Sequence, residues 1–228
     1  MPMRTLRGLV ALAILAAAVP MVAQSVTSPG VHPLSGRRFA GVMGWQGAEW
    51  LERSERELEE APDKALDALG PLIGQTVADV GAGSGYFTVR LAARVGKQGR
   101  VYANDLQPEM LKMLAARLAR ENVPNVTLIP GAVDDVRLPP SSTDLVLMVD
   151  VYHEFSEPQK MLRSIRAALK PGGRLVLLEY RKEDPEVPIR FEHKMSIAEA
   201  KLEVEAEGFR LSKVDDRLPR QHILIFSK

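Results

Sequence analysis

The sequence has no cysteine in its 228 residues, which excludes disulfide bonds, thiolate metal sites and cysteine nucleophiles. It also lacks an excess of charge of either sign: 30 lysines and arginines stand against 29 aspartates and glutamates, a net charge of +1. Without a basic surplus there is no electrostatic case for a nucleic-acid partner, and we expect none. The four histidines are scattered without a His-x-x-x-His pair, so the sequence predicts no metal site.

The chain begins with a segment that is typical of a signal peptide. Residues 1–7 are basic, and residues 9–19 are continuously apolar until Pro20 interrupts them before a stretch of small residues. The apolar run is shorter than the roughly 20 residues of a comfortable membrane span. We predict that residues 1–25 are a signal peptide or an uncleaved signal anchor. The protein would then be exported, periplasmic or secreted, or attached to a membrane through this segment alone.

The most informative stretch is a strand, a glycine turn and a helix in succession. Residues 77–80 are apolar and predict a buried strand; Gly81, Gly83 and Gly85 follow at alternate positions, and a helical pattern begins at Tyr86. Glycine has no Cβ and tolerates positive φ, so bare backbone can approach a ligand near the free N–H groups of the helix. A dinucleotide fingerprint would have its third glycine where this chain has Tyr86. That difference argues against an NAD-dependent oxidoreductase, which we keep as an alternative.

The pattern Asp79-x-Gly-x-Gly-x-Gly resembles motif I of the class I S-adenosylmethionine (SAM) dependent methyltransferases. SAM has no phosphate but carries an ammonium group, which the carboxylate of Asp79 suits. The resemblance covers about residues 70–228 and includes the sequence Leu-Lys-Pro-Gly-Gly-Arg-Leu at 169–175. It implies SAM as the cofactor, with motif I residues Asp79, Gly81, Ala82, Gly83, Gly85 and Tyr86 around it. SAM is made in the cytoplasm, which conflicts with the predicted export.

An acidic residue ends the second predicted strand, residues 100–105. Asp105 lies 20 residues beyond Gly85, and a carboxylate at this place can accept both ribose hydroxyls of an adenosine. Leu106 would then flank the adenine. The alternative is that Asp105 caps the helix that Pro108 begins.

The loop after the third predicted strand, residues 126–129, contains Gly131, Asp134 and Asp135. In the family that the motif resembles, an acid in this loop recognises the adenine amino group and often follows the glycine directly. Ala132 occupies that place here. We therefore expect Asp134 or Asp135, or backbone groups, to take the role.

The fourth predicted strand, residues 144–150, ends in Asp150, an expected cofactor contact, and leads into Tyr152, His153 and Glu154. In doubly wound sheets ligands lie beyond the carboxyl ends of the strands, so a methyl acceptor is expected here. His153 is the best candidate for a general base, because an imidazole titrates near neutral pH; the alternative is a structural hydrogen bond. Tyr152 and Glu154 are candidates by position.

The whole pattern predicts a doubly wound α/β fold with a mostly parallel seven-stranded sheet and helices on both faces. Five β–α steps and a terminal antiparallel pair would occupy residues 70–228, and residues 26–69 would form an arm and a helical cover. Capping boxes are expected at 156–159 and 196–199. We expect methyl transfer from SAM to a small-molecule acceptor. A SAM-fold binding protein without turnover is the alternative from another functional class.

Overall fold

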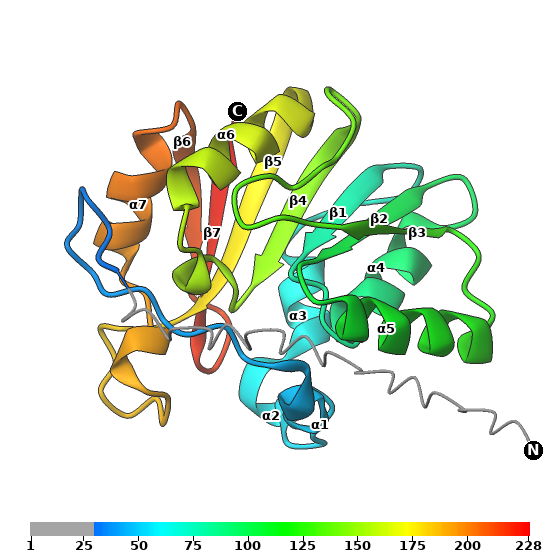
Figure 1. The fold of residues 1–228 in the computed structure, drawn as a ribbon, viewed down its shortest axis with the longest axis horizontal. Coiled ribbons are helices and arrows are strands. Elements are labelled where there is room, and N and C mark those ends of the chain that lie inside the picture. Colours follow the sequence, from blue (N-terminus) through cyan, green and yellow to red (C-terminus); the bar gives the residue numbers. More distant parts are fainter. Residues whose placement is uncertain (1–29) are drawn as a thin grey trace, which may run out of the picture.

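The structure is a computed structural model that describes residues 30–228, so the signal-peptide prediction lies outside the described residues and stays a prediction. Its centre is a seven-stranded sheet (Figure 1). The strands are β1 (Thr76–Val80), β2 (Arg100–Asp105), β3 (Val126–Pro130), β4 (Thr143–Val149), β5 (Leu169–Tyr180), β6 (Arg210–Asp215) and β7 (Gln221–Ser227). Their spatial order is β3-β2-β1-β4-β5-β7-β6. Strands β1 to β5 are parallel, and β7 is antiparallel to both of its neighbours, which confirms the predicted fold class.

Helices cover both faces of this sheet. They are α1 (Ala48–Leu51), α2 (Arg56–Glu60), α3 (Pro62–Asp67), α4 (Tyr86–Val95), α5 (Pro108–Glu121), α6 (Pro158–Ala168) and α7 (Ile197–Glu205). Leu145 and Leu147 of β4 share an apolar cluster with α3 and α4, whereas Val146 and Met148 share another with α6 and α7. A strand that is buried on both faces needs apolar residues at every position, which explains the continuous apolar run of β4.

The number of β–α steps was predicted wrongly. Residues 131–142, between β3 and β4, form a loop without a helix, so there are four β–α steps rather than five. The capping box at Ser196 and Glu199 is confirmed. The one expected at 156–159 is wrong: Glu157 holds the N-cap position without a side-chain bond, because the helix begins one residue later than a box on Ser156 requires.

Within the predicted helical cover, residues 48–60 form two helices, α1 and α2, with a break between them. The backbone carbonyl of Trp50 accepts a hydrogen bond from Nη1 of Arg53 (2.9 Å), and that of Leu51 accepts one from Nη1 of Arg56 (2.9 Å). These side chains satisfy carbonyls at the end of α1, where the backbone N–H groups of a continuing helix would otherwise bond. The break leaves α1 and α2 as separate short helices at the carboxyl edge of the sheet (Figure 1).

Residues 30–47 form an arm along the carboxyl edge of the sheet (Figure 1). Its anchor is Arg37, whose guanidinium makes a buried ion pair with Glu203 of α7 (Nε–Oε1 2.8 Å) and donates to the backbone oxygen of His153 (3.0 Å). At its other end the arm bonds to the side chain of Gln107, next to α5. The arm is therefore fixed at both sides of the edge where ligands bind in such sheets.

We predict that Arg37→Met lowers the free energy of unfolding by about 3–5 kcal/mol, because it leaves the buried carboxylate of Glu203 without its cation. Urea unfolding at pH 7 measures the loss. The double variant Arg37→Met, Glu203→Leu should recover a large part of it, since no unpaired charge is then buried. A single variant as stable as the wild type would show that the ion pair does not hold the arm.

Candidate active site

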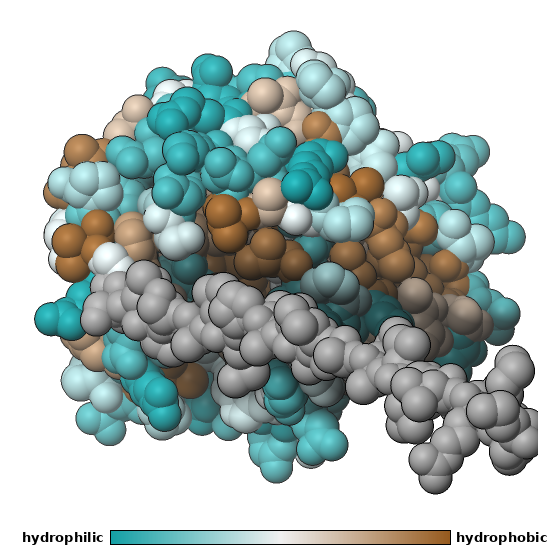
Figure 2. Space-filling view, in the orientation of Figure 1, coloured by the Kyte–Doolittle hydropathy of each residue, from teal (hydrophilic) through white to brown (hydrophobic). Residues whose placement is uncertain are grey.

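A cavity of about 680 Å³ opens at the carboxyl ends of β1, β2 and β4. The glycine loop after β1, the end of β2, the segment after β4, the arm and α1 all contribute to its wall. Apolar side chains gather in the middle of the face of the molecule that Figure 2 shows. Seven of the residues that the sequence predicts for the site line this cavity: Gly81, Gly83, Asp105, Leu106, Asp150, His153 and Glu154.

The glycine loop presents backbone to this cavity. Gly81 has φ +74°, and a Cβ there would lie 2.5 Å from Cγ2 of Val151. The N–H of Gly83 donates to Oδ2 of Asp105 (2.8 Å), which ties the loop to the end of β2. Gly85 has a different role: at φ +91° its Cβ would lie 2.2 Å from Leu114 of α5, so it permits helix packing instead of lining the cavity.

Asp105 is buried at the cavity wall, beside Leu106. Its second oxygen, Oδ1, accepts the N–H of Gln107 (2.8 Å), but the N-cap of α5 is Gln107, so Asp105 is not the helix cap. Each carboxylate oxygen has two lone pairs, and one on each remains for a ligand hydroxyl. Burial raises the pKa of Asp105 above its ordinary value, against the effect of the backbone hydrogen bonds.

The adenine prediction must be corrected for Asp134 and Asp135. The cavity is lined in this loop by Ala132 and Val133. Asp135 instead accepts hydrogen bonds from the hydroxyl of Ser164 (2.6 Å) and from the N–H of Arg137, and Asp134 is partly exposed 4.0 Å from Lys160. Both carboxylates stabilise the loop and α6 rather than face the cavity. Backbone groups of the loop, the other option predicted, remain for adenine.

Asp79 lies beside the main cavity rather than in it. It is 2% exposed, accepts a hydrogen bond from the hydroxyl of Thr88 (2.6 Å), and lines a small second cavity with Ala82 and Tyr86. Arg56 and other residues line both cavities, so the two spaces adjoin. Burial raises the pKa of Asp79 to about 6, and Asp105 adds a smaller contribution; the hydrogen bond from Thr88 and the charge of Arg56 offset this only in part. A cationic ligand group beside Asp79 would therefore be stabilised by its carboxylate.

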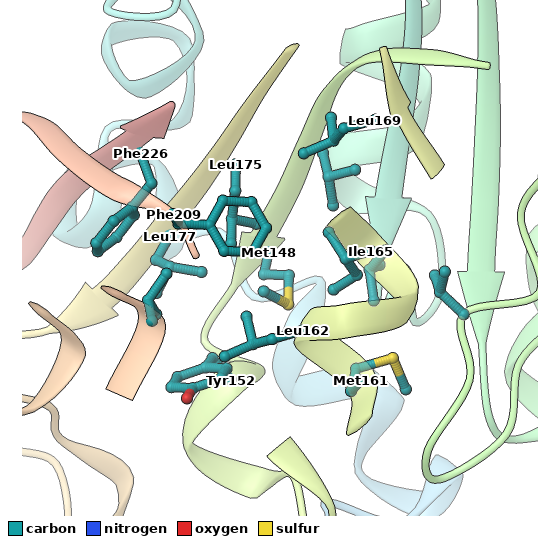
Figure 3. Close-up of a cluster of buried hydrophobic side chains, with 14 of the residues drawn as sticks. Met148, Tyr152, Met161, Leu162, Ile165, Leu169, Leu175, Leu177, Phe209 and Phe226 are labelled. Carbon is teal, nitrogen blue, oxygen red and sulfur yellow. The ribbon is translucent and has the colours of Figure 1, made fainter. Parts of the chain in front are cut away.

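Tyr152 is not a cavity residue, and the prediction that it belongs to the site is wrong. Its side chain points into the apolar core toward Leu162 and Leu177, as Figure 3 shows. The reason is that β4 ends at Val149, Asp150 and Val151 continue along the cavity edge, and the 3-10 turn Tyr152–Glu154 then directs Tyr152 inward. Its contribution to the site is its backbone N–H, which donates to Oε1 of Glu179 (2.9 Å).

His153 is held from behind by Glu179. Nδ1 of the imidazole lies 2.6 Å from Oε2 of the carboxylate, and the two side chains are 2% and 0% exposed. Burial lowers the pKa of His153, but the charge and hydrogen bond of Glu179, together with the charges of Glu154 and Asp150, raise it above the ordinary value. Glu179 was not identified from the sequence; the next residue of β5, Tyr180, lines the cavity. The buried acid in an apolar strand was the signal that could have identified Glu179.

Glu154 and His193 complete this end of the cavity. Nδ1 of His193 lies 3.2 Å from Nε2 of His153 and 4.0 Å from Oε1 of Glu154. Burial raises the pKa of Glu154 to about 7 against the opposing effect of His153, and burial lowers the pKa of His193. Histidines that lie 40 positions apart in the sequence therefore meet, because the segment after β5 returns to the end of β4.

Asp150 follows β4 directly and is another acid at the carboxyl edge, together with Asp79 and Asp105. It has φ +53°, and its Oδ2 accepts a hydrogen bond from Nε2 of Gln221 (2.7 Å). Its Oδ1 is buried without a hydrogen-bond partner among residues 30–228. Burial, and then the charges of Glu60 and Glu179, raise its pKa well above the ordinary value. A buried oxygen without a partner at a cavity wall is a suitable place for a ligand donor.

A family model described as a methyltransferase domain matches residues 77–173. The ubiquinone/menaquinone biosynthesis C-methyltransferase UbiE of Escherichia fergusonii is 34% identical over 118 residues, 51% of this chain and 47% of that protein. The chain thus spans about half the length of the curated relatives it matches.

Among solved structures, a SAM-dependent methyltransferase from Aquifex aeolicus has a TM-score of 0.76 and 27% identity, over 82% of this chain and 98% of that one. A SAM-dependent methyltransferase from Mesorhizobium loti has the same fold, with a TM-score of 0.59 and 18% identity over 81% of this chain and 100% of that one. Residues 77–173 therefore match a methyltransferase domain, and the fold is that of the class I SAM-dependent methyltransferases, whose cofactor is SAM. No helix in residues 30–228 has the length and hydropathy of a membrane span.

We predict that Asp79→Asn changes how stability depends on pH. A carboxyl whose pKa is raised from about 3.9 in the unfolded chain to about 6 stabilises the fold only while it is protonated. The wild type therefore loses this contribution as the pH rises from 4 through 6, and the variant does not. The stability of the variant relative to the wild type should increase over this range by up to about 3 kcal/mol. Urea unfolding at several pH values measures it, and a constant difference would contradict the assignment.

Proposed function

We propose that the protein transfers a methyl group from SAM to a small-molecule acceptor that binds in the same cavity. The observation that carries this proposal is the continuity of the cavity, which extends from Gly83 and Asp105 at one end to His153 and Glu154 at the other. When bound, the SAM sulfonium supplies a methyl group that leaves by in-line displacement. The protein then has mainly to align the acceptor and exclude water.

The charges at the carboxyl edge support a cationic cofactor. Asp79, Asp105 and Asp150 come from the ends or flanks of three adjacent strands, and all three are buried or nearly so. Positive groups such as the ammonium and sulfonium of SAM would stabilise the charged form of these carboxyls, whereas the pyrophosphate of a dinucleotide would oppose it. We assign the ribose hydroxyls to Asp105, and the ammonium group to Asp79 or to the free oxygen of Asp150.

The acceptor end favours an apolar ring compound with a few oxygen atoms. Its walls include Met43, Phe155 and Ile189, whereas His153 and Glu154 are the polar groups that would orient an oxygen atom. The similar UbiE protein is named for ubiquinone and menaquinone biosynthesis. The methyltransferase-domain model matches residues 77–173 of this chain, which include the glycine loop. We propose an acceptor of the same chemical kind, a phenol or quinol precursor.

We predict that Asp105→Asn weakens the binding of S-adenosylhomocysteine about 10- to 100-fold, because hydrogen bonds to a charged acceptor contribute about 1.5–3 kcal/mol. Asparagine keeps only one acceptor oxygen, so the hydrogen bond from either Gly83 or Gln107 is lost and some thermal stability is lost with it; thermal denaturation checks that the variant is folded at the temperature of the titration. The matched control is Asp134→Asn, an acid outside the cavity, which should bind as the wild type does. Titration calorimetry measures both.

The proposal fails if the wild type binds NAD in place of S-adenosylhomocysteine. It also fails if the folded wild type binds neither compound. If Asp105→Asn and Asp134→Asn weaken the binding of S-adenosylhomocysteine equally, the effect comes from overall charge and not from contact with the ribose.

A further inference from the structure

His153, Glu154 and His193 bring three possible metal ligands to one point of the cavity wall. One donor atom from each side chain lies within 4.8 Å of the other two. Two imidazoles and one carboxylate form the ligand set of many catalytic zinc sites. We propose that these three side chains bind one divalent transition-metal ion of the zinc type.

The distance between the two imidazoles fits this proposal. Zinc–nitrogen bonds are about 2.0–2.1 Å long, so two nitrogens on one tetrahedral ion are about 3.3 Å apart. Nε2 of His153 and Nδ1 of His193 are 3.2 Å apart. Oε1 of Glu154 lies 4.0 Å from Nδ1 of His193, and the three donor atoms lie within 4.8 Å of one another, so the Glu154 carboxylate has to move toward the imidazoles to complete the set.

Glu179 supplies the outer contact that such a site needs. Metal-binding imidazoles usually donate their other N–H to a carboxylate, which fixes the ring and its tautomer. Glu179 lies 2.6 Å from Nδ1 of His153 and is fully buried, so Nε2 is the atom that is directed toward the other ligands. Nε2, which lies beside Nδ1 of His193, is therefore the atom of His153 that would act either as a metal ligand or as the predicted general base.

The site has three protein ligands, which leaves a coordination position open. All three residues line the cavity, so the open position is accessible to the acceptor that we propose above, and the role of the ion rests on that proposed function. An ion there would bind the hydroxyl oxygen of a phenol and lower its pKa. The phenol proton passes to water, an electron pair of the phenolate forms the bond to the methyl carbon, and the bond from that carbon to sulfur breaks with its electron pair on sulfur.

The test uses the full-length protein without a histidine tag, treated with a chelator and then titrated with Co²⁺, whose visible absorption reports coordination by nitrogen and oxygen. We expect one equivalent of Co²⁺ to bind and one equivalent of Zn²⁺ to displace it. His193→Ala should weaken binding at least 100-fold, and Glu179→Gln should weaken it 10- to 100-fold. His193 is on a partly exposed turn, so His193→Ala should fold. His193→Asn is a second variant that removes the imidazole but keeps a polar side chain.

The matched control is His222→Ala, which removes another histidine that lies between two carboxylates, Asp216 and Glu183. It should bind Co²⁺ as the wild type does. The proposal is overturned if the wild type binds no ion, or if the His193 variants keep the site, or if the His222 variant loses it. Binding of S-adenosylhomocysteine to the same samples tests the proposed function separately, because Asp105 and the glycine loop do not require the ion.

Discussion

The parallel pairing of β1 with β2 and β4 is the constraint on which the site depends. In a parallel sheet the carboxyl ends of neighbouring strands meet at one edge, and β1 pairs in register with β2 on one side and β4 on the other. The glycine loop, Asp105 and Asp150 are adjacent for this reason alone. The apolar residues that bury β4 on both faces therefore also determine where the polar residues after it lie.

The arm adds a second constraint, because it fixes the segment after β4 from outside the sheet. Arg37 bonds to Glu203 of α7 and to the backbone of His153, so a buried ion pair connects one end of the sheet to the acceptor end of the cavity. The backbone N–H of Met43 then donates to Glu154 (3.3 Å). Two of the three proposed metal ligands are thus held by contacts from residues far away in the sequence.

Features set by local chemistry could be predicted from the sequence. The glycines, Asp105 and the succession of strands follow from motif spacing and apolar runs, which report directly on backbone geometry and burial. Side-chain direction after a strand could not be predicted. Tyr152 entered the core because the 3-10 turn rotates it, and Asp135 turned to Ser164 of α6, a partner that only the folded chain brings near.

The histidine cluster could not be predicted for a related reason. Metal-site patterns in a sequence report ligands on one helix or turn, whereas His153 and His193 come from segments after β4 and after β5. Glu179 and Tyr180 are successive residues of β5, and side chains alternate between the two faces of a strand. The turn after β4 nevertheless places His153 on the face of β5 to which Glu179 belongs.

Several buried acids surround the cavity, and we take the basis for binding a cationic cofactor to be that its positive groups stabilise the charged form of these carboxyls. A crystal structure of the protein with S-adenosylhomocysteine tests this claim most directly. We predict that the ribose lies on Asp105, the adenine beside Leu106 and Ala132, and the sulfur toward Glu154 and His153. A ligand bound outside this cavity, or one whose sulfur faces away from Glu154, would contradict the claim.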